Sequence, residues 1–466
     1  MISLGCAKNQ VDSELILSRF LAHGFRVVQR PIDADLVVIN TCGFIGPAKE
    51  ESIDTILDCL EGKRRRSALR VMVAGCLYQR YPGIPAELAQ VDYWLTAPER
   101  ADLDSLVRGV AADLYLSPRR LPRARDGSRR QVLLSEPGSA YLRISQGCDR
   151  PCAFCAIPTI KGPQRSRSIP ELVADVQRLS STFGVKEVNL VGQDLTRYGE
   201  DQGPNRFLEL LTALEHDTDV RWFRLLYVYP LGLTPRVLEF LSRSSRFARY
   251  LDIPFQHSHG DVLKRMKRGG SGSRFLRDLD RIRAALPGVA VRTTMLVGHP
   301  GEEERHFEAL LEFIRHARFE WMGVFPYSRE DGTPSARMRG QVSPAIAEER
   351  AEEAMETFRQ SRSLEAFGLG RVREALVIER ERDGRLVCRT EKEAPEVDGL
   401  VFVSPQPGID PGQMVAVRVT EAVDLDFAGE FVPDRPARPR RPGDRTGAGP
   451  SRRGSAARHS GRGARR

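Results

Sequence analysis

Hydrophobic positions in residues 1–115 alternate between short apolar runs and helical spacing. Leu36–Ile39 and Val71–Ala74 have the length and composition of buried strands, and Met1–Leu4 is a shorter run of the same kind. Between Leu36–Ile39 and Val71–Ala74, apolar side chains from Ile53 to Leu60 recur every three or four residues, as on one face of a helix. Strands that alternate with helices indicate a parallel sheet. We therefore expect an N-terminal α/β domain over residues 1–115.

Residues 131–368 repeat the strand-and-helix pattern six times, after an Arg- and Pro-rich linker at 116–135. The six candidate strands are Tyr141–Ser145, Glu187–Val191, Trp222–Tyr227, Tyr250–Pro254, Val289–Val297 and Trp321–Phe325. Six βα units predict a partial (β/α) barrel, whose active site lies at the carboxyl ends of its strands. A charged helix over 344–367 leads out of this predicted core.

The pattern changes again after residue 368. Short runs such as Glu374–Glu379, Gly399–Val403 and Met414–Val419 are separated by turns rich in Gly, Pro and Asp. We therefore expect residues 369–432 to form a small antiparallel β-barrel that is OB-like in character.

Residues 433–466 carry the whole net charge of the chain. That charge is +9, and this segment contains eleven Arg and two Asp among Pro, Gly and Ser. A segment of this composition cannot bury a core, so we expect a disordered Arg-rich tail. Nonspecific contact with RNA and a solubilising role are both compatible with such a tail.

The composition of the chain indicates a cytoplasmic protein. No apolar run approaches the ~20 residues needed to span a bilayer, so no membrane association is expected. The N-terminus lacks the layout of a secretory signal. In such a chain, eight cysteines are more typical of metal ligands or reactive thiols than of disulfides.

Three cysteines are closely spaced on the loop after the first predicted barrel strand. Cys148, Cys152 and Cys155 form a CxxxCxxC motif. Three thiolates can hold three irons of a [4Fe–4S] cluster and leave the fourth open to S-adenosylmethionine, which one electron then cleaves to a 5′-deoxyadenosyl radical. A zinc loop is the alternative, but zinc sites usually take four protein ligands, and the sequence has no second CxxC pair. The motif therefore favours a radical-SAM enzyme.

Cys6, Cys42 and Cys76 are far apart in sequence but share one position in the predicted fold. Each follows a predicted strand of the N-terminal sheet. Because parallel strands end at one edge of a sheet, the three thiolates can converge there on a second cluster. Three buried structural thiols are the alternative interpretation.

Two other cysteines and two histidines are weaker candidates. Cys59 falls within a predicted helix and Cys388 within a predicted strand, where both are expected to pack as apolar side chains. His257 and His259 follow the end of a predicted strand. Contact with substrate or cofactor and a simple polar turn are the two interpretations of this pair.

The motifs together resemble those of the radical-SAM methylthiotransferases. The matching segments are Ser-Leu-Gly-Cys-Ala-Lys-Asn at 3–9, Val-Asp-Ser-Glu at 11–14, Asn-Thr-Cys-Gly-Phe-Ile at 40–45, Ala-Gly-Cys-Leu at 74–77, the CxxxCxxC loop, Val-Gly-Gln-Asp at 191–194, Pro-Phe-Gln-His at 254–257 and Leu-Lys-Arg-Met-Lys-Arg at 263–268. The last domain resembles TRAM. The resemblance implies two [4Fe–4S] clusters, one that supplies sulfur and one that uses S-adenosylmethionine to make a radical. It leaves the electron donor and the sulfur source as external partners.

Two branches of this family differ in substrate. One modifies the β-carbon of an aspartate in the twelfth small-subunit ribosomal protein, and the other modifies an adenosine of tRNA. Val-Asp-Ser-Glu, Cys-Gly-Phe-Ile, Tyr-Val-Tyr-Pro at 227–230 and Ala-Pro-Glu-Val-Asp-Gly at 394–399 resemble the ribosomal-protein branch. Gln193, just after a predicted barrel strand, and Phe154, within the cluster loop, are candidate cofactor contacts.

The charge of the last domain favours the ribosomal-protein substrate independently. Residues 371–432 contain 8 basic and 13 acidic residues. Binding to tRNA needs Lys and Arg to replace counterions along the phosphates. An acidic surface instead favours a basic partner such as a ribosomal protein. Glu391, Glu393 and Glu396 are expected to contribute to that surface.

Overall fold

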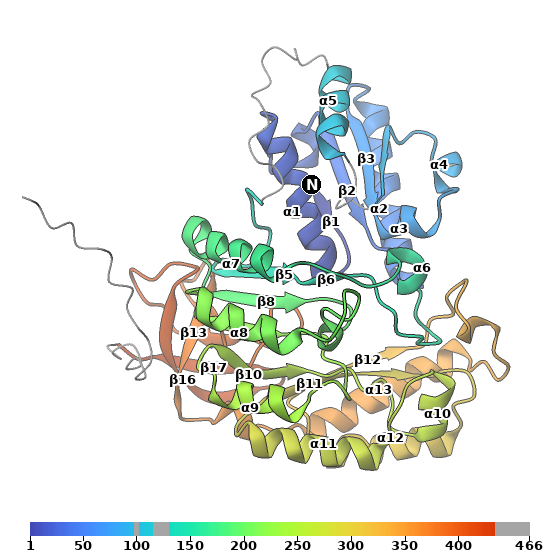
Figure 1. Cartoon of the computed structure of the whole chain (residues 1–466). Coiled ribbons are helices and arrows are strands. Elements are labelled where there is room, and N and C mark those ends of the chain that lie inside the picture. The colour runs from blue at the N-terminus through green and yellow to red at the C-terminus, as the bar shows by residue number, and fades with distance from the viewer. Residues whose placement is uncertain (97–101, 115–129, 434–466) are drawn as a thin grey trace, which may run out of the picture.

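The computed structural model describes residues 1–96, 102–114 and 130–433 (Figure 1). Most of the linker predicted at 116–135, and almost all of the disordered tail predicted at 433–466, lie outside these residues. The described part contains a four-stranded sheet, a six-stranded sheet and a closed five-stranded barrel, with one small two-stranded ribbon. It contains no helix that is long and apolar enough to cross a membrane.

The N-terminal sheet is parallel, as predicted, and it has helices on both faces. Its strands, in spatial order, are β1 (Ile2–Ser3), β2 (Leu36–Thr41), β3 (Arg70–Gly75) and β4 (Tyr93–Leu95). The helices are α1 (Ala7–Ala22), α2 (Gly46–Arg65), α3 (Cys76–Arg80), α4 (Ile84–Glu87) and α5 (Leu103–Asp113). Apolar side chains of α1 and α5 pack on one face of the sheet, and those of α2 pack on the other.

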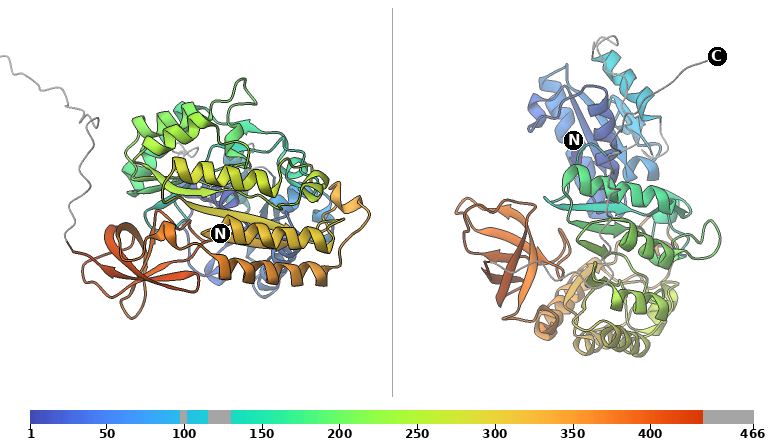
Figure 2. Two further views of the ribbon diagram at one scale, coloured as in Figure 1. Left: turned by 90° about the horizontal axis from the view of Figure 1, so that it is seen from below. Right: turned by 60° about the vertical axis from the view of Figure 1, so that its left-hand side comes forward.

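The central unit is an open half-barrel of six parallel strands (Figures 1 and 2). The strands are β5 (Ser139–Arg143), β8 (Glu187–Val191), β9 (Trp222–Leu225), β10 (Phe247–Asp252), β11 (Ala290–Val297) and β12 (Trp321–Pro326). The helices are α6 (Ile157–Lys161), α7 (Ile169–Phe183), α8 (Phe207–Asp217), α9 (Pro235–Arg243), α10 (Gly260–Arg265), α11 (Gly272–Ala285), α12 (Glu304–Ala317) and α13 (Pro344–Ser361), and β6 (Ser145–Gln146) pairs with β7 (Arg165–Ser166). The six predicted strands are therefore confirmed, whereas the charged helix ends at Ser361 and is followed by a separate 3-10 turn at Glu365–Phe367.

The C-terminal unit is a closed barrel in which one strand pair departs from the prediction. Its strands are β13 (Val372–Arg380), β14 (Leu386–Thr390), β15 (Val401–Val403), β16 (Met414–Val423) and β17 (Asp426–Phe431). They close in the order β13-β14-β15-β17-β16. β17 lies between β15 and β16 and runs parallel to β15, so the barrel is not wholly antiparallel.

The C-terminal barrel packs against the end of the half-barrel at which the strands begin. Trp321, the first residue of β12, donates its indole N–H to the carbonyl oxygen of Lys392 at 2.7 Å. Glu187, the first residue of β8, is fully buried between Arg224 of the half-barrel (2.8 Å) and Arg389 of the C-terminal barrel (2.7 Å). This packing leaves the functional chemistry to the opposite end, where the strands finish.

The same packing corrects the expectation for three carboxylates. Glu393 is buried, and its carboxylate accepts hydrogen bonds from the backbone N–H and hydroxyl of Thr390, so it does not contribute to a binding surface. Glu391 is half-buried and accepts a hydrogen bond from the backbone N–H of Arg249 in the half-barrel. Glu396 alone of the three is exposed. These acidic residues were predicted to face solvent because sequence cannot show which charges lie in a domain interface.

Replacement of Glu187 should be the most damaging change at this interface. Burial alone would raise the pKa of Glu187, but the Arg389 and Arg224 guanidinium groups hold it at about 2, below its ordinary 4.5. Removal of one partner from a buried ion pair costs about 3 to 5 kcal/mol. We expect that loss in the free energy of unfolding of Glu187→Gln, measured by urea denaturation. The stability that Glu187 contributes should be present above pH 4.5 and disappear as the pH falls towards 2.

Glu374→Gln is the matched control. Its carboxylate pairs with Arg221 across the same interface, but both side chains are about one-third exposed. The expected loss is under about 1 kcal/mol because solvent screens the pair. Equal losses in the two variants would contradict the importance given to burial.

Candidate active site

Cys6, Cys42 and Cys76, here called the first triad, lie at one edge of the N-terminal sheet. Cys6 precedes α1 shortly after β1, Cys42 directly follows β2, and Cys76 directly follows β3 as the first residue of α3. The three strands run parallel and in register, so their carboxyl ends meet. The predicted convergence of three distant cysteines is therefore what the topology produces.

One side chain, that of Asn9, holds the three segments of the first triad together. Its amide nitrogen donates to the carbonyl oxygen of Leu4 at 3.1 Å and to that of Thr41 at 2.9 Å. Its amide oxygen accepts from the thiol of Cys76 at 3.4 Å. The side chain is buried, so these partners fix its position. Asn9 was not singled out from the sequence, although it ends the motif at 3–9.

Two glycines allow the triad segments to approach closely. Gly5 has a φ of +90°, and a Cβ atom there would lie 2.9 Å from the Cβ of Cys42. A Cβ at Gly43 would lie 2.8 Å from the backbone of Cys76. A side chain at either position would therefore push one cysteine segment away from another.

Cys148, Cys152 and Cys155, here called the second triad, lie on the loop between β6 and α6. The backbone N–H of Cys155 donates to the carbonyl oxygen of Cys152 at 3.2 Å, which forms a tight turn. The backbone N–H of Cys148 donates to Gly162 at 3.1 Å and ties the start of the loop to the end of α6. The loop lies at the carboxyl end of the half-barrel, where the sequence placed it.

Two arginines contact the sulfur atoms of the second triad. The backbone N–H of Arg150 donates to Cys148 Sγ at 3.4 Å, and the Arg268 guanidinium donates to Cys152 Sγ at 3.6 Å. Both guanidinium groups lie on the ring of Tyr229, at 3.8 Å and 4.7 Å from its centroid. Sequence reasoning missed this Arg–Tyr–Arg stack, although Arg268 ends the motif at 263–268 and Tyr229 belongs to the motif at 227–230.

The two triads lie beside each other. Cys76 packs against Ala156 and Ile160, and Ala156 is the residue that follows Cys155. Two carboxylates of α1 attach the N-terminal unit to the half-barrel here. Asp12 forms an ion pair with Arg143 and lies 3.6 Å from Lys161, and Glu14 pairs with Arg130 at 2.9 Å. The Val-Asp-Ser-Glu motif at 11–14 thus supplies the contact that brings the triads together.

Burial raises the pKa of four of the six thiols and so favours their protonated form. It raises the pKa of Cys76 and that of Cys155 to about 12, and it raises the pKa values of Cys42 and Cys148 in the same direction. Iron binds thiolates, so loading either site must release protons.

The spacing of the thiols fits a cluster better than a single ion. Tetrahedral ligands at about 2.3 Å from one zinc ion lie roughly 3.8 Å apart. Within the described residues, one group alone brings three His, Cys, Asp or Glu ligand atoms within 4.8 Å of one another, and it contains no cysteine. Neither triad therefore has the compact arrangement that one ion needs, whereas three thiolates that each bind a different iron of a cluster do not need it.

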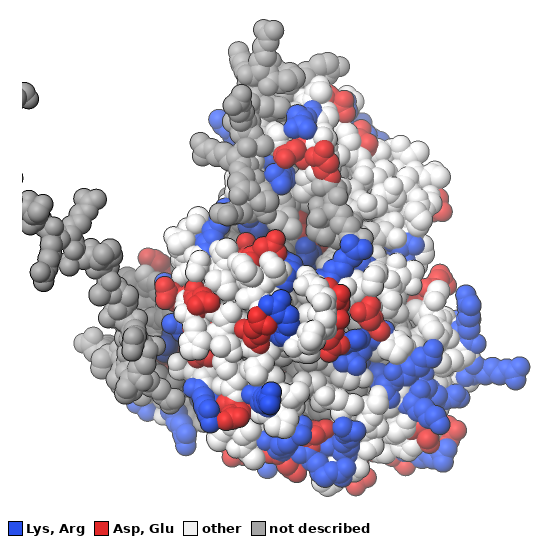
Figure 3. Space-filling view, in the orientation of Figure 1, with Lys and Arg blue, Asp and Glu red and all other residues white. Residues whose placement is uncertain are grey.

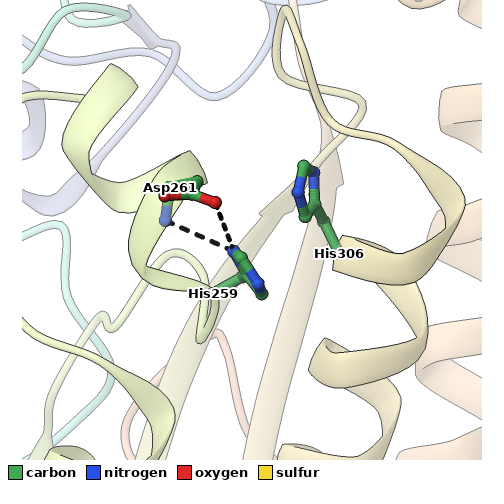
Figure 4. A group of neighbouring side chains, drawn as sticks. All are labelled: His259, Asp261 and His306. Atoms are coloured by element: carbon green, nitrogen blue, oxygen red, sulfur yellow. Dashed lines mark hydrogen bonds and ion pairs between the residues drawn. The ribbon is translucent and has the colours of Figure 1, made fainter.

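That one compact group consists of His259, Asp261 and His306 (Figure 4). The backbone N–H of Asp261 donates to His259 Nδ1 at 3.3 Å, and that of Glu303 donates to His306 Nδ1 at 3.0 Å. These lone pairs cap α10 and α12 and are not directed at an ion. His257 Nδ1 likewise accepts from the backbone N–H of His259 at 2.9 Å, so the two histidines form the polar turn that was one of their two interpretations.

The remaining candidates occupy four different environments. Gln193 is half-buried two residues beyond the end of β8, at the carboxyl end of the half-barrel. Phe154 packs within the second-triad loop against apolar side chains of α10 and β11. Cys388 is buried in β14, and Cys59 is half-buried on α2, away from both triads in sequence and structure.

Comparison with known proteins places the three units in families. Residues 1–96 match the Uncharacterized protein family UPF0004, residues 142–314 match the Radical SAM superfamily, and residues 369–432 match the TRAM domain. The chain also resembles the structure of a radical S-adenosylmethionine methyltransferase, TsrM from Kitasatospora setae. The TM-score is 0.52 at 14% identity, over 72% of this chain and 74% of the other. The fold and the second triad thus define a radical-SAM protein with a TRAM domain.

Proteins of similar sequence identify the family to which the whole chain belongs. A ribosomal protein uS12 methylthiotransferase RimO of Anaeromyxobacter sp. (strain K) is 41% identical over 95% of each chain. Another RimO, of Myxococcus xanthus (strain DK1622), is 40% identical over 94% of this chain and 92% of its own. The chain belongs to the RimO family of methylthiotransferases.

Asn9→Ala should weaken the first triad selectively. Loss of one amide would leave the Leu4 and Thr41 segments and the Cys76 thiol without their shared partner. About eight irons per chain are expected after anaerobic reconstitution. We expect the variant to lose up to half of them while the iron of the second triad is retained. Iron analysis with the variant Asn205→Ala as control tests this, since Asn205 makes side-chain hydrogen bonds away from either triad. Full iron content in Asn9→Ala would contradict the role.

Proposed function

We propose that this chain adds a methylthio group to the β-carbon of an aspartate in ribosomal protein uS12, with two [4Fe–4S] clusters and S-adenosylmethionine as cofactors. The observation that supports this best is that Cys76 shares one apolar cluster with Ala156 and Ile160, because Ala156 directly follows Cys155 and the two groups of three cysteines are thereby neighbours. Membership of the RimO family gives the substrate. Relatives of this kind do not favour the tRNA adenosine alternative.

Each triad would hold one cluster through three thiolates and leave one iron without a protein ligand. Cys6, Cys42 and Cys76 would hold the cluster associated with sulfur, and Cys148, Cys152 and Cys155 the cluster associated with S-adenosylmethionine. When bound, these groups supply radical chemistry and a methylthio group. Arg150 and Arg268 donate hydrogen bonds to thiolate sulfurs, which is one of the means by which proteins set the potential of such clusters. Gln193 and Phe154 stay candidates for contact with S-adenosylmethionine.

Lys8 is suited to receive the aspartate of the substrate. It lies two residues after Cys6, and its ammonium group is 3.6 Å from the centroid of the Tyr227 ring. Tyr227 follows β9 at the carboxyl end of the half-barrel, two residues before Tyr229 of the arginine stack. A cation at this junction attracts a carboxylate and gives no comparable advantage to an adenine base.

The proposed function also requires partners from outside the chain and a cellular location. An electron donor and a sulfur source must come from outside the chain, and a protein that modifies ribosomes works in the cytoplasm. We place the domain limits at 1–115, 131–368 and 369–432. The basic tail at 433–466 contributes at most nonspecific contact with RNA.

Replacement of the cysteines in each triad should affect a different part of the reaction. Replacing Cys148, Cys152 and Cys155 with Ala should halve the iron and abolish production of 5′-deoxyadenosine. Replacing Cys6, Cys42 and Cys76 with Ala should also halve the iron, but 5′-deoxyadenosine should still form while methylthiolation of uS12 stops. Cys59→Ala and Cys388→Ala are the controls and should retain all of the iron. Persistent 5′-deoxyadenosine in the first variant would refute the assignment of the second triad.

Mass spectrometry of the products tests the substrate. The reconstituted chain is incubated anaerobically with uS12, small ribosomal subunits or tRNA. A methylthio group on the uS12 aspartate is the expected result. Modification of tRNA with uS12 left unchanged would overturn the proposed substrate.

A further inference from the structure

Five exposed cations gather beside the second triad without acidic partners. They are Lys264, Arg265, Lys267, Arg337 and Arg339, here called the cationic patch. Figure 3 shows Lys and Arg gathered on the surface over α10 and the loop that follows β12. Within the described residues, no side chain of the patch takes part in an ion pair or a hydrogen bond. Some other arginines on the described surface have an acidic neighbour, for example Arg206 with Glu209, and others stand singly; the patch differs from these in that its five cations lie together on two adjoining segments.

The patch is built on segments that are bonded to the loop of the second triad. The backbone N–H of Ala153, the residue after Cys152, donates to the carbonyl oxygen of Met266 at 2.9 Å. The backbone N–H of Ser335 donates in turn to Ala153 at 2.9 Å. Lys267 directly follows Met266, and Arg337 lies two residues after Ser335. The patch therefore borders the mouth of the half-barrel.

Arg265 and Arg339 join the two parts of the patch. The Arg265 guanidinium lies over Gly301, since it is 2.4 Å from the point where a Cβ of that glycine would be. The backbone N–H of Gly301 donates to the carbonyl oxygen of Gly340 at 2.7 Å, next to Arg339. The cations of α10 and those of the loop after β12 thus form one continuous surface.

Lys267 occupies a backbone position that normally takes glycine. Its φ is +54°, and it follows the C-cap of α10. Its N–H bonds to Lys264 and that of Arg268 bonds to Leu263, which is the Schellman arrangement. A side chain is strained in this left-handed conformation, and glycine is not. The lysine thus places a cation at this turn at a cost in backbone strain.

We propose that the cationic patch binds the phosphate backbone of ribosomal RNA, so that the enzyme recognises uS12 within an RNA-bound particle. The proposal rests on the proposed function. A basic ribosomal protein alone would be repelled by five unpaired cations beside the reaction site. Phosphates spaced along an RNA strand match a surface of cations on two adjoining segments. An acidic protein segment is the competing ligand and is an outcome of the test.

The first test measures RNA binding without catalysis. The reconstituted full chain, a variant with all five patch residues changed to Gln, and a control variant are titrated against a fluorescent fragment of small-subunit ribosomal RNA. The control changes Arg26, Arg236, Arg277, Arg315 and Arg382 to Gln. These residues are exposed and lie on other surfaces, and their replacement removes the same net charge as in the patch variant. Both variants keep the basic tail, so its contribution to binding cancels.

The patch variant should bind the RNA about tenfold or more weakly than the control. The slope of log affinity against log salt concentration should also be smaller in magnitude for the patch variant than for the control. The difference should be up to about 3.5 to 4.5, the value expected for five lost phosphate contacts. Equal affinities and slopes in the two variants would refute the proposal.

The second test compares methylthiolation of small ribosomal subunits with that of free uS12. We expect the ratio of the two activities to fall about tenfold in the patch variant and to stay unchanged in the control. A fall in both activities with the ratio unchanged would show that the patch contacts protein instead of RNA. Failure of the unaltered enzyme on both substrates would refute the proposed function, whereas the RNA-binding result would still stand or fall independently.

Lys267→Gly separates charge from backbone conformation. The melting temperature should be unchanged or higher because glycine relieves the left-handed strain, while RNA binding weakens. A melting temperature that rises with no change in RNA binding would show that the lysine charge has no such use.

Discussion

The structure depends on the contact between the carboxyl edges of two parallel sheets. Parallel strands deliver whatever follows them to one edge, and in both sheets the residues that follow include three cysteines. The edges meet because Asp12 and Glu14 of α1 pair with Arg143 and Arg130 of the half-barrel. Those charges are nearly completely buried, so the docking geometry is fixed by paired groups that could not be left alone. The neighbouring triads are a consequence of that docking.

The sequence was sufficient for most of the elements and for the positions of the six cysteines at the carboxyl ends of strands. Strands such as Glu187–Val191 are short apolar runs, and each run sits between helices of clear period, so local pattern and topology agree. The first triad was less certain from spacing alone, because convergence depends on strand order, which periodicity does not give. The family resemblance implied a second cluster at these cysteines. The position of Asn9 could not be inferred, since its partners Leu4, Thr41 and Cys76 meet only after the sheet has formed.

Charge was the property that sequence described least well. The count for residues 371–432 is correct, but it treats every carboxylate as exposed. In the structure Glu393 is buried, and Glu374 pairs with Arg221 across the interface with the half-barrel. Arg389 of the same segment is fully buried against Glu187. The net charge of a segment therefore says little about its surface when charges of both signs are buried in a domain interface.

Charge around the half-barrel is used in two opposite ways: buried ion pairs join domains at both ends, and unpaired cations gather at the end where the strands finish. Where the strands begin, the ion pair of Glu187 with Arg224 and Arg389 is closed and serves only to join two domains. Where the strands end, the five cations of the patch stay unpaired within the described residues, and one of them occupies a strained backbone position. The buried ion pairs contribute to folding stability, whereas the unpaired surface cations do not. Unpaired charge beside a reaction site is accordingly the feature that points outward, to a partner that carries the missing negative charge.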